Sequence, residues 1–583
     1  MSWRSCIIAM LATSLVLATP LCMVSFEQAP YHFNLRTFSS YQELLHFLER
    51  NCKYPKEGCY YLALGTAPIK KESGRYLDFS KTNIQVEGVD EPDIIKTDGK
   101  FLYLISGSRV YIIKAYPPND AKITSSIPLT GESANGLFIN GNKLIVFTTR
   151  GCKVNIYLYD LTDIENPTLL RSVSVNGSYV DARMIDSHVY LISSDPIWRF
   201  YENGQLKIPI IEVDGKAIRI KPNEIYYFSV SEPVDAMTHV ISLDINSLKV
   251  HHKSFLIGRS HTIYASRNNI YIASSNRYSW SAETTIHKVE IKDGRIYYVA
   301  SAKVPGYILN QFSMDEHNGF LRVATTTGNV WDGSSKNNIY ILDKDMKLVG
   351  KIEGLAPKER IYSVRFMGNR AYLVTFKKVD PFFVVDVSDP SNPKVLGELK
   401  IPGFSNYLHP YDENHIIGIG KDTVEALPEE KEQRGIDFAW YQGLKIALFD
   451  ATDPTNPREI SKVTIGDRGT YSPALWNHKA FLFSREKHIL VIPVTVYKID
   501  DETKERLNGY TGSIYGKFVF QGVYVYNVDL DNGIVYKGRI SHGKGKEIKR
   551  SLYIGNVLYT FSDEMIKMNR LDTLEAIGEI EIP

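Results

Sequence analysis

The fold is decided by residues 360–403, RIYSVRFMGNRAYLVTFKKVDPFFVVDVSDPSNPKVLGELKIPG. Three runs of β-branched and aromatic residues are separated by a Gly-Asn turn, a Val-Asp-Pro kink and an Asp-Pro-Ser-Asn-Pro turn, and a fourth run, KVLGELKI, follows. Gly, Asn, Asp and Pro supply turn geometries, whereas β-branched and aromatic residues fit a pleated surface. The stretch therefore predicts a meander of four antiparallel strands.

The same pattern recurs along the chain, for example at 154–177, 443–467 and 522–541. From about Thr82 onward the sequence divides into nine successive units, each with four strands that we name A to D. The units cover residues 90–130, 133–177, 178–257, 259–305, 307–355, 358–402, 404–466, 470–541 and 547–583.

Small sheets of this kind cannot bury both faces alone, so neighbouring sheets must stack. Radial stacking around a channel, a β-propeller, achieves this while exposing few strand edges. A linear solenoid would need shorter repeats, and a β-sandwich would not repeat so often. We expect an all-β protein, a β-propeller of eight or nine four-stranded blades over residues 81–583, in which residues 82–89 lend a strand to close the ring.

The N-terminal residues 1–25 predict an export signal, because Arg4 precedes an uncharged apolar run from Cys6 to Ala18. The alternative is an uncleaved membrane anchor of roughly 20 residues. Both interpretations place the bulk of the chain outside the cytoplasm, either secreted or tethered to the membrane by this segment.

Residues 26–80 predict a small helical segment. Ser40 and Glu43 form a capping box at the start of a helix within 35–51, and an apolar face follows. That face consists of Leu44, Leu45, Phe47 and Leu48. We expect it to pack against the side or an end of the β array.

The chain has five cysteines, two of them in the signal region. Cys52 and Cys59 enclose the short loop NCKYPKEGC, and in an oxidising compartment such a pair predicts a disulfide. Two unpaired thiols are the alternative. Cys152 is then single, and we interpret it as a passive small residue in a turn between strands.

Long stretches resemble a known family. They are TNIQVEGVDEPDIIKTDGKFLYLI (82–105), the run from Arg365 to Gly420 and GDRGTYSPALWNHKAFLFSREKHILVIPV (466–494). The family comprises exported archaeal and bacterial proteins with a C-terminal β-propeller domain distantly related to WD40 repeats. The resemblance implies fold and export, and it transfers no functional residue because the family has no established activity.

The formal net charge is only +2, with acids and bases interspersed. No basic stripe stands out, so we expect no nucleic-acid partner. We also expect no cofactor.

The insertions fall in one class of loop, the connections between strands B and C. They lie at about 194–237, 274–284, 325–338, 421–442 and 497–519. In a propeller all B–C loops emerge on one face, and extra mass on one face of a repeat protein often marks the binding face.

Aromatic residues gather in the same insertions. Four of the five tryptophans outside the signal region fall there, namely Trp198, Trp280, Trp331 and Trp440, and Trp476 is predicted to lie within a strand. Tyr278, Tyr441, Tyr510 and Tyr515 accompany them. Exposed Trp and Tyr rings suit stacking on sugars or anchoring of peptides. The alternative is that each Trp only fastens its own loop to the propeller.

Other candidate sites are weaker. His409, Asp412, Glu413 and His415 could ligate a metal, but turn chemistry already explains the middle residues and no metal site is predicted. Asp90, Glu91 and Asp93 form an acidic group without the spaced carboxylates of a calcium loop.

We find no G-x-S-x-G or H-E-x-x-H motif. A glycosidase pair of carboxylates is set by space, and loop acids such as Glu283, Glu425 and Asp437 could supply one. Asn176 begins an N-glycosylation sequon.

The sequence thus favours an extracellular binding module, with no catalytic residue assigned, whose ligand is a glycan or a peptide segment of an envelope protein. The candidate ligand-binding residues are Trp198, Trp280, Trp331, Trp440, Tyr278 and Tyr441. A polysaccharide hydrolase that uses loop carboxylates on the same face is the alternative, and a surface protein with buried Trp rings is a third.

Overall fold

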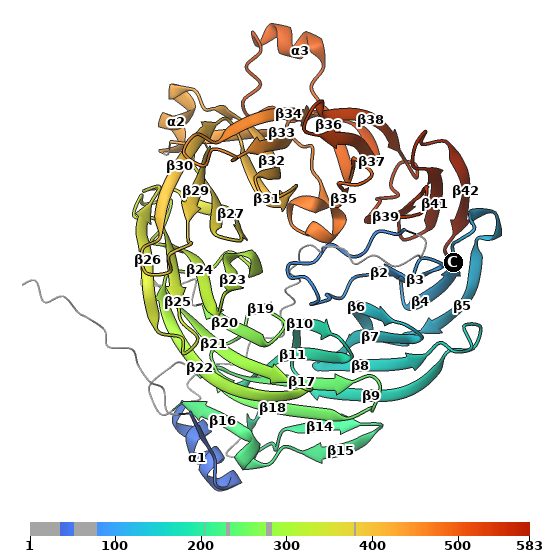
Figure 1. Ribbon diagram of the computed structural model, residues 1–583, viewed down its shortest axis with the longest axis vertical. Coiled ribbons are helices and arrows are strands. Elements are labelled where there is room, and N and C mark those ends of the chain that lie inside the picture. The colour runs from blue at the N-terminus through green and yellow to red at the C-terminus, as the bar shows by residue number, and fades with distance from the viewer. Residues whose placement is uncertain are drawn as a thin grey trace, which may run out of the picture. The chain divides into compact units, whose positions relative to one another are not determined.

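The computed structural model describes residues 35–51, 78–202, 205–228, 234–275, 283–377, 380–435 and 437–583. Within these residues, nine sheets built on four antiparallel strands follow one another around a common axis (Figure 1). The predicted all-β propeller is confirmed, and the number of blades is nine. Each blade corresponds to one of the nine sequence units.

The strands of the first five blades, from the innermost A to the outer D, have the following bounds. They are β2 (Ile95–Thr97), β3 (Phe101–Ser106), β4 (Arg109–Lys114) and β5 (Lys122–Pro128) in blade 1; β6 (Ser133–Asn140), β7 (Lys143–Arg150), β8 (Lys153–Asp160) and β9 (Thr168–Asn176) in blade 2; β10 (Ser178–Ile185), β11 (His188–Pro196), β17 (Ala236–Asp244) and β18 (Val250–Ile257) in blade 3; β19 (Thr262–Ala265), β20 (Asn269–Ser275), β21 (Glu283–Lys292) and β22 (Arg295–Pro305) in blade 4; and β23 (Met314–His317), β24 (Phe320–Thr327), β25 (Lys336–Leu342) and β26 (Leu348–Leu355) in blade 5.

The last four blades have the same order. They comprise β27 (Arg360–Met367), β28 (Arg370–Phe376), β29 (Asp380–Asp386) and β30 (Lys394–Ile401) in blade 6; β31 (Phe404–Pro410), β32 (His415–Glu425), β33 (Ala439–Asp450) and β34 (Arg458–Ile465) in blade 7; β35 (Leu482–Ser484), β36 (Ile489–Lys498), β37 (Lys517–Asp529) and β38 (Gly533–Ile540) in blade 8; and β39 (Arg550–Ile554), β40 (Val557–Phe561), β41 (Met565–Arg570) and β42 (Ala576–Glu581) in blade 9.

Hydrophobic cores lie between adjacent blades. Blades 6 and 7 share a buried cluster in which the ring of Phe382 stacks on that of Phe449, with 4.6 Å between the ring centroids. The middle strand β28 is buried from Ala371 to Phe376, whereas the outer strand β30 is largely exposed. Both faces of a middle strand are therefore covered, which explains its near-continuous apolar run.

The largest B–C insertion wraps around the outer edge of the ring. Within it, β14 (Ile210–Val213) and β15 (Lys216–Arg219) extend blade 2 beyond β9, and β16 (Ile225–Phe228) extends blade 3 beyond β18. The short strands β12 (Tyr201–Glu202) and β13 (Gln205–Leu206) pair with each other. The expectation that every insertion adds mass to one face is thus wrong for this one, because its β-prone segments pair with strand edges that would otherwise be open.

The N-terminal helical segment lies on this same edge. Strand β1 (Leu35–Thr37) pairs with β16, and helix α1 (Tyr41–Asn51) buries Leu44 and Leu48 against the core shared by blades 2 and 3. The backbone N–H of Glu43 donates to the Ser40 hydroxyl, but the Glu43 carboxylate accepts from Ser39 rather than from Ser40. Packing against the side of the array is therefore confirmed.

Residues 78–93 run through the middle of the ring, where Figure 1 draws them as a blue trace. The segment hydrogen-bonds to several blades in turn: Ser80 to Tyr553, Asn83 to His478, Gln85 to Met314, Asp90 to Met184 and Asp93 to Leu137. Residues 82–89 form no strand, so the expected strand sharing at ring closure is wrong. Backbone and side-chain groups of this segment instead pair with backbone groups of the blades and their connections.

The ring closes by direct packing of blade 1 on blade 9. The two blades share a hydrophobic cluster, and the hydroxyl of Tyr559 donates to the carbonyl of Ala115 at 2.7 Å. The hydroxyl of Tyr111 donates to the carbonyl of Pro583 at the same distance. Each end blade is thus complete in itself and needs no borrowed strand.

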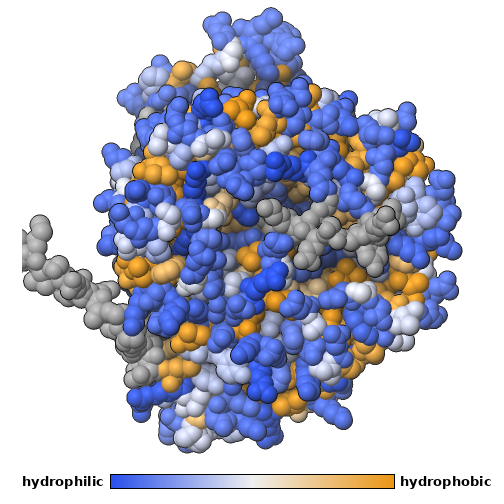
Figure 2. All heavy atoms as spheres, viewed as in Figure 1, coloured by the Kyte–Doolittle hydropathy of each residue, from blue (hydrophilic) through white to orange (hydrophobic). Residues whose placement is uncertain are grey.

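Hydrophilic side chains predominate on the face shown in Figure 2, with small hydrophobic areas scattered between them. Among the described residues, no helix has the length and apolar character needed to cross a membrane. A specific site on such a surface is expected in a local recess.

Candidate binding pocket

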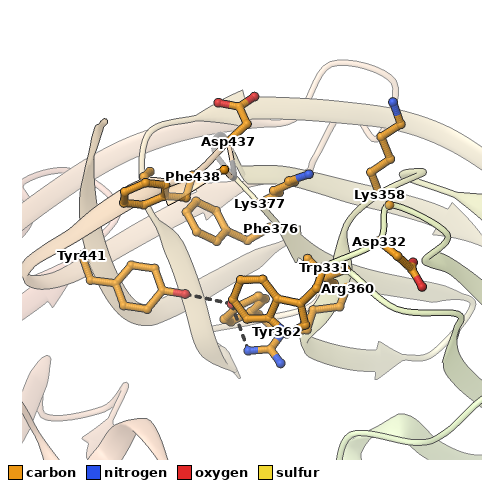
Figure 3. A pocket seen from close by; sticks show the side chains of 14 residues that line it. Trp331, Asp332, Lys358, Arg360, Tyr362, Phe376, Lys377, Asp437, Phe438 and Tyr441 are labelled. Carbon is orange, nitrogen blue, oxygen red and sulfur yellow. Dashed lines mark hydrogen bonds between the residues drawn. The ribbon is translucent and has the colours of Figure 1, made fainter. Parts of the chain in front are cut away.

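A pocket of about 380 Å³ lies where the B–C loops of blades 5 and 7 approach the strands of blade 6 (Figure 3). Its walls come from four segments of three blades, at residues 330–333, 358–362, 376–377 and 435–441. The lining residues are Val330, Trp331, Asp332, Gly333, Lys358, Arg360, Tyr362, Phe376, Lys377, Gly435, Asp437, Phe438, Ala439 and Tyr441. The pocket thus joins two of the predicted insertions.

Tyr362 and Tyr441 meet across the boundary between blades 6 and 7. Their hydroxyl oxygens are 2.9 Å apart, and Arg360 donates to the Tyr362 hydroxyl at 3.1 Å (Figure 3). The Arg360 guanidinium also lies over the Tyr362 ring, 4.8 Å from its centroid. Burial and the neighbouring Tyr362 raise the pKa of Tyr441, so the Tyr441 hydroxyl remains protonated near neutral pH.

Buried rings hold the two tyrosines in place. Phe376 packs edge-on against Tyr362 with 5.6 Å between centroids, and Phe404 packs edge-on against Tyr441 at 5.0 Å. Phe376 and Phe404 are each only 2% exposed. The tyrosine pair is therefore supported from below by the core of blades 6 and 7.

Trp331 lies at the rim of the pocket and is 73% exposed. Its backbone N–H donates to the side chain of Asn329, and the N–H of Lys358 donates to the carbonyl of Ser335 in the same loop. Lys358 has a φ of 73°, a left-handed conformation that a residue with a Cβ adopts at a cost of about 1 kcal/mol. The loop is thus fixed by its backbone while the indole ring remains available.

The opposite wall comes from the blade 7 insertion, which contains helix α2 (Pro428–Arg434). Gly435 ends this helix with a φ of 63° and lines the pocket together with Asp437 and Phe438. Blade 8 carries a second short helix, α3 (Asp501–Arg506), in its own insertion.

Trp440 fastens the α2 loop to the propeller. It is 6% exposed, and its indole N–H donates to Glu430 at 2.9 Å. The guanidinium groups of Arg434 and Arg468 lie 4.2 and 4.8 Å from its ring centroid. Trp440 does not line the pocket, and its position matches the alternative that a Trp secures its own loop.

The acids near the pocket are already engaged. Hydrogen bonds from Ser334 lower the pKa of Asp332, and Lys431 lies 2.6 Å from Glu425 and 3.3 Å from Asp437. A general acid requires a raised pKa. Asp332 is therefore unsuited to donate a proton at neutral pH.

The remaining predicted aromatic residues are dispersed. Trp198 is half-buried in a turn of blade 3 under the guanidinium of Arg199, 5.2 Å away, and Trp280 and Tyr278 lie outside the described residues. Tyr510 bonds to Glu430 in the α2 loop, and Tyr515 lies under the Arg468 guanidinium.

Trp476 does not lie in a strand as expected. It follows a 3-10 turn (Pro473–Leu475) in the connection from blade 7 to blade 8, because Ser472 and Pro473 begin a turn there, and it is 69% exposed. It does not line the pocket.

The histidine-rich turn of blade 7 is spread over two environments. His409 is buried, bonds to the Tyr407 hydroxyl and has its pKa lowered to about 3 by burial. His415 lies between Asp412 and Asp450, at 2.8 and 3.5 Å. Within the described ranges, no cluster of three or more His, Cys, Asp or Glu side chains could hold a metal ion.

The acidic group at 90–93 divides among different partners. Asp90 pairs with Lys96 at 2.6 Å and Asp93 with Arg550 at 3.0 Å, whereas Glu91 accepts from the backbone of Gln85 and from the amide of Gln311. These contacts attach the segment of residues 78–93 to its neighbours in the ring.

Three further predicted residues fall elsewhere. Glu283 is exposed at the start of β21, and Asn176 is half-buried at the end of β9. Cys52 and Cys59 lie outside the described residues.

The sequence predicted Trp331 and Tyr441 as candidate binding residues, and both line the pocket. Arg360, Tyr362 and Phe376 also line it and were not predicted. These three occupy strand positions, and their letters resemble those of any other core strand. The only available signal was position, since the start of strand A and the end of strand B lie on the same face as the B–C loops.

The fold and this recess define a nine-bladed β-propeller with a side pocket at its inserted loops. Residues 79–574 match the family described as "Beta propeller domain", and the chain belongs to that family.

Two archaeal proteins and one protein of known structure are among those to which this chain is similar. An uncharacterized protein of Methanocaldococcus jannaschii is 33% identical, covering 85% of this chain and 82% of its own length. One of Archaeoglobus fulgidus is 29% identical, covering 95% and 96%. A Lactobacillus plantarum protein of known structure covers 61% of this chain and 94% of its own, at 11% identity and a TM-score of 0.32.

Proposed function

We propose that this chain is an extracytoplasmic binding module that holds a glycan in the pocket between blades 5, 6 and 7. One observation carries the proposal: Trp331, Tyr362, Phe438 and Tyr441 line one recess together with polar groups. Flat rings with a polar edge bind the apolar faces of sugars, while charged and hydroxyl groups orient the sugar hydroxyls. A peptide segment of an envelope protein is the competing ligand.

Binding fits the pocket better than hydrolysis does. Glycosidic cleavage needs two carboxyl groups flanking the bond, one of them with a raised pKa. Hydrogen bonds from Ser334 keep the Asp332 carboxyl ionised, and Lys431 pairs with both Glu425 and Asp437. The hydrolase alternative would require these ion pairs to be broken.

The test is a glycan and peptide array probed with the mature protein and three variants. We expect Trp331→Ala and Tyr441→Ala to lose the wild-type signals, because each removes a ring from the pocket. Trp476→Ala is the matched control, since this indole is 69% exposed, close to the 73% of Trp331, and lies outside the pocket. Wild-type signals that survive both pocket variants would refute the proposal, and signals only on peptides would replace the glycan by a peptide.

Export is part of the same proposal and rests on the sequence of residues 1–25. N-terminal sequencing of the protein from its native cells distinguishes a cleaved signal from a retained anchor. Peptide mapping without reductant tests the Cys52–Cys59 bridge, and two free thiols would contradict it. Mass spectrometry of the peptide that contains Asn176 tests glycosylation.

A further inference from the structure

The pocket is lined by three cationic residues and by two acidic ones. Lys358, Arg360 and Lys377 line it, and none of the three forms a salt bridge within the described part of the chain. Arg360 donates a hydrogen bond from one nitrogen to the Tyr362 hydroxyl. The two lining acids, by contrast, are engaged with Ser334 and Lys431.

This imbalance is local. The whole chain carries a formal net charge of only +2. Three cations without a salt bridge around one recess raise the local concentration of anions. They also strengthen the binding of anions once water is partly excluded.

The cations are distributed along the pocket rather than gathered at one point. Figure 3 shows Arg360 beside the tyrosine pair, Lys358 on the opposite side and Lys377 between Phe376 and Lys358. Spaced cations fit a ligand that carries negative groups at intervals.

The lining also offers partners for a saccharide. Asp332 and Asp437 can each accept a hydrogen bond from a sugar hydroxyl. Trp331 offers a broad exposed ring of the kind that stacks on a sugar face.

We infer that the pocket binds an anionic saccharide, whose rings carry carboxylate or sulfate groups, with its acid groups at Lys358, Arg360 and Lys377. The inference deepens the proposed glycan binding and rests on it. The carboxylate and sulfate forms share the recognition chemistry of a charge-assisted hydrogen bond to Lys or Arg.

The experiment is calorimetric titration of the mature protein with three probes: tetragalacturonate, its fully methyl-esterified form and a heparin tetrasaccharide. We expect tetragalacturonate or the heparin probe to bind about tenfold more tightly than the neutral ester, and more weakly as salt rises. The tighter of the two identifies the acid group.

The variant Lys358→Gln/Arg360→Gln should lose this preference, so that the acid and its ester bind with similar affinity. Denaturant unfolding of the variant, compared with that of the wild type, checks that it is folded. Lys122→Gln, an exposed lysine of β5 in blade 1, is the control and should leave all affinities unchanged.

Equal affinity for the acid and its ester would overturn the inference but leave the proposed glycan binding intact. Failure of all three probes to bind would do the same if the array signals still depend on Trp331. Poly-glutamate is titrated separately as an acidic peptide, and tighter binding of it than of either acidic saccharide would overturn the inference too. Loss of every array signal would instead refute the proposed function.

Discussion

The hydroxyl oxygens of Tyr362 and Tyr441 lie 2.9 Å apart, although 79 positions separate the two residues in the sequence. Tyr362 belongs to the inner strand of blade 6 and Tyr441 to the third strand of blade 7. Their contact connects two blades at the pocket.

Replacing Tyr441 by Phe tests this contact. The ring and its packing on Phe404 remain, while the hydrogen bond is lost, so we expect a loss of about 1 kcal/mol in the free energy of unfolding. A double-mutant cycle with Tyr362→Phe, measured by denaturant unfolding, should show that the two losses are not additive. Simple additivity would mean that the hydroxyls do not interact.

Trp440→Ala should loosen the α2 loop. The change removes a buried ring, its bond to Glu430 and its stacking with two guanidinium groups, and we expect a loss of about 3 kcal/mol. Proteolysis within residues 428–438 should become faster. Trp331→Ala is the control, because an exposed ring contributes only about 0.5 kcal/mol or less. Equal effects of the two substitutions would contradict the structural role of Trp440.

The pair Asp93–Arg550 should be important for the placement of the channel segment. Asp93 and Arg550 are 5% and 8% exposed and lie 3.0 Å apart. Asp93→Asn leaves a buried guanidinium without its charge partner, so we expect a loss of about 3 kcal/mol in thermal or denaturant unfolding. The exposed pair Arg570–Asp572 offers a comparison: Asp572→Asn should cost much less, because solvent screens this pair. Similar losses at both pairs would refute this assignment.

Glu91 should make the stability depend on pH. Burial raises the pKa of its carboxyl to about 7, against the partly compensating charges of Arg183 and Lys479. Between about pH 4.5 and 7 the folded state therefore holds a proton that the unfolded state releases, and stability falls as pH rises through this window.

Glu91→Gln should remove that fall. Relative to wild type, the variant should gain stability on going from pH 4.5 to pH 7, by up to about 3 kcal/mol. Glu87→Gln, an exposed residue of the same segment, is the matched control. Parallel profiles of wild type and Glu91→Gln in urea unfolding would show that Glu91 does not titrate in this range.

The sequence by itself determined the blades. Turn residues between β-prone runs indicated nine units with their boundaries, and the loops that carry insertions. A capping box and an apolar face indicated the helix near residue 41. These features depend on residues that are neighbours in the chain, since a turn or an alternating strand is specified within a few positions. Trp331 and Tyr441 followed from the same local pattern.

Only the tertiary structure decided which residues meet. Tyr362, Phe376 and Arg360 become pocket residues because blades 6 and 7 pack side by side, and Asp93 reaches Arg550 because a segment of irregular backbone crosses the channel. The burial of Trp440 and the exposure of Trp476 likewise depend on neighbouring loops. Core and pocket positions of a strand carry the same types of residue, since both favour aromatic and β-branched side chains. Only packing distinguishes the two kinds of position.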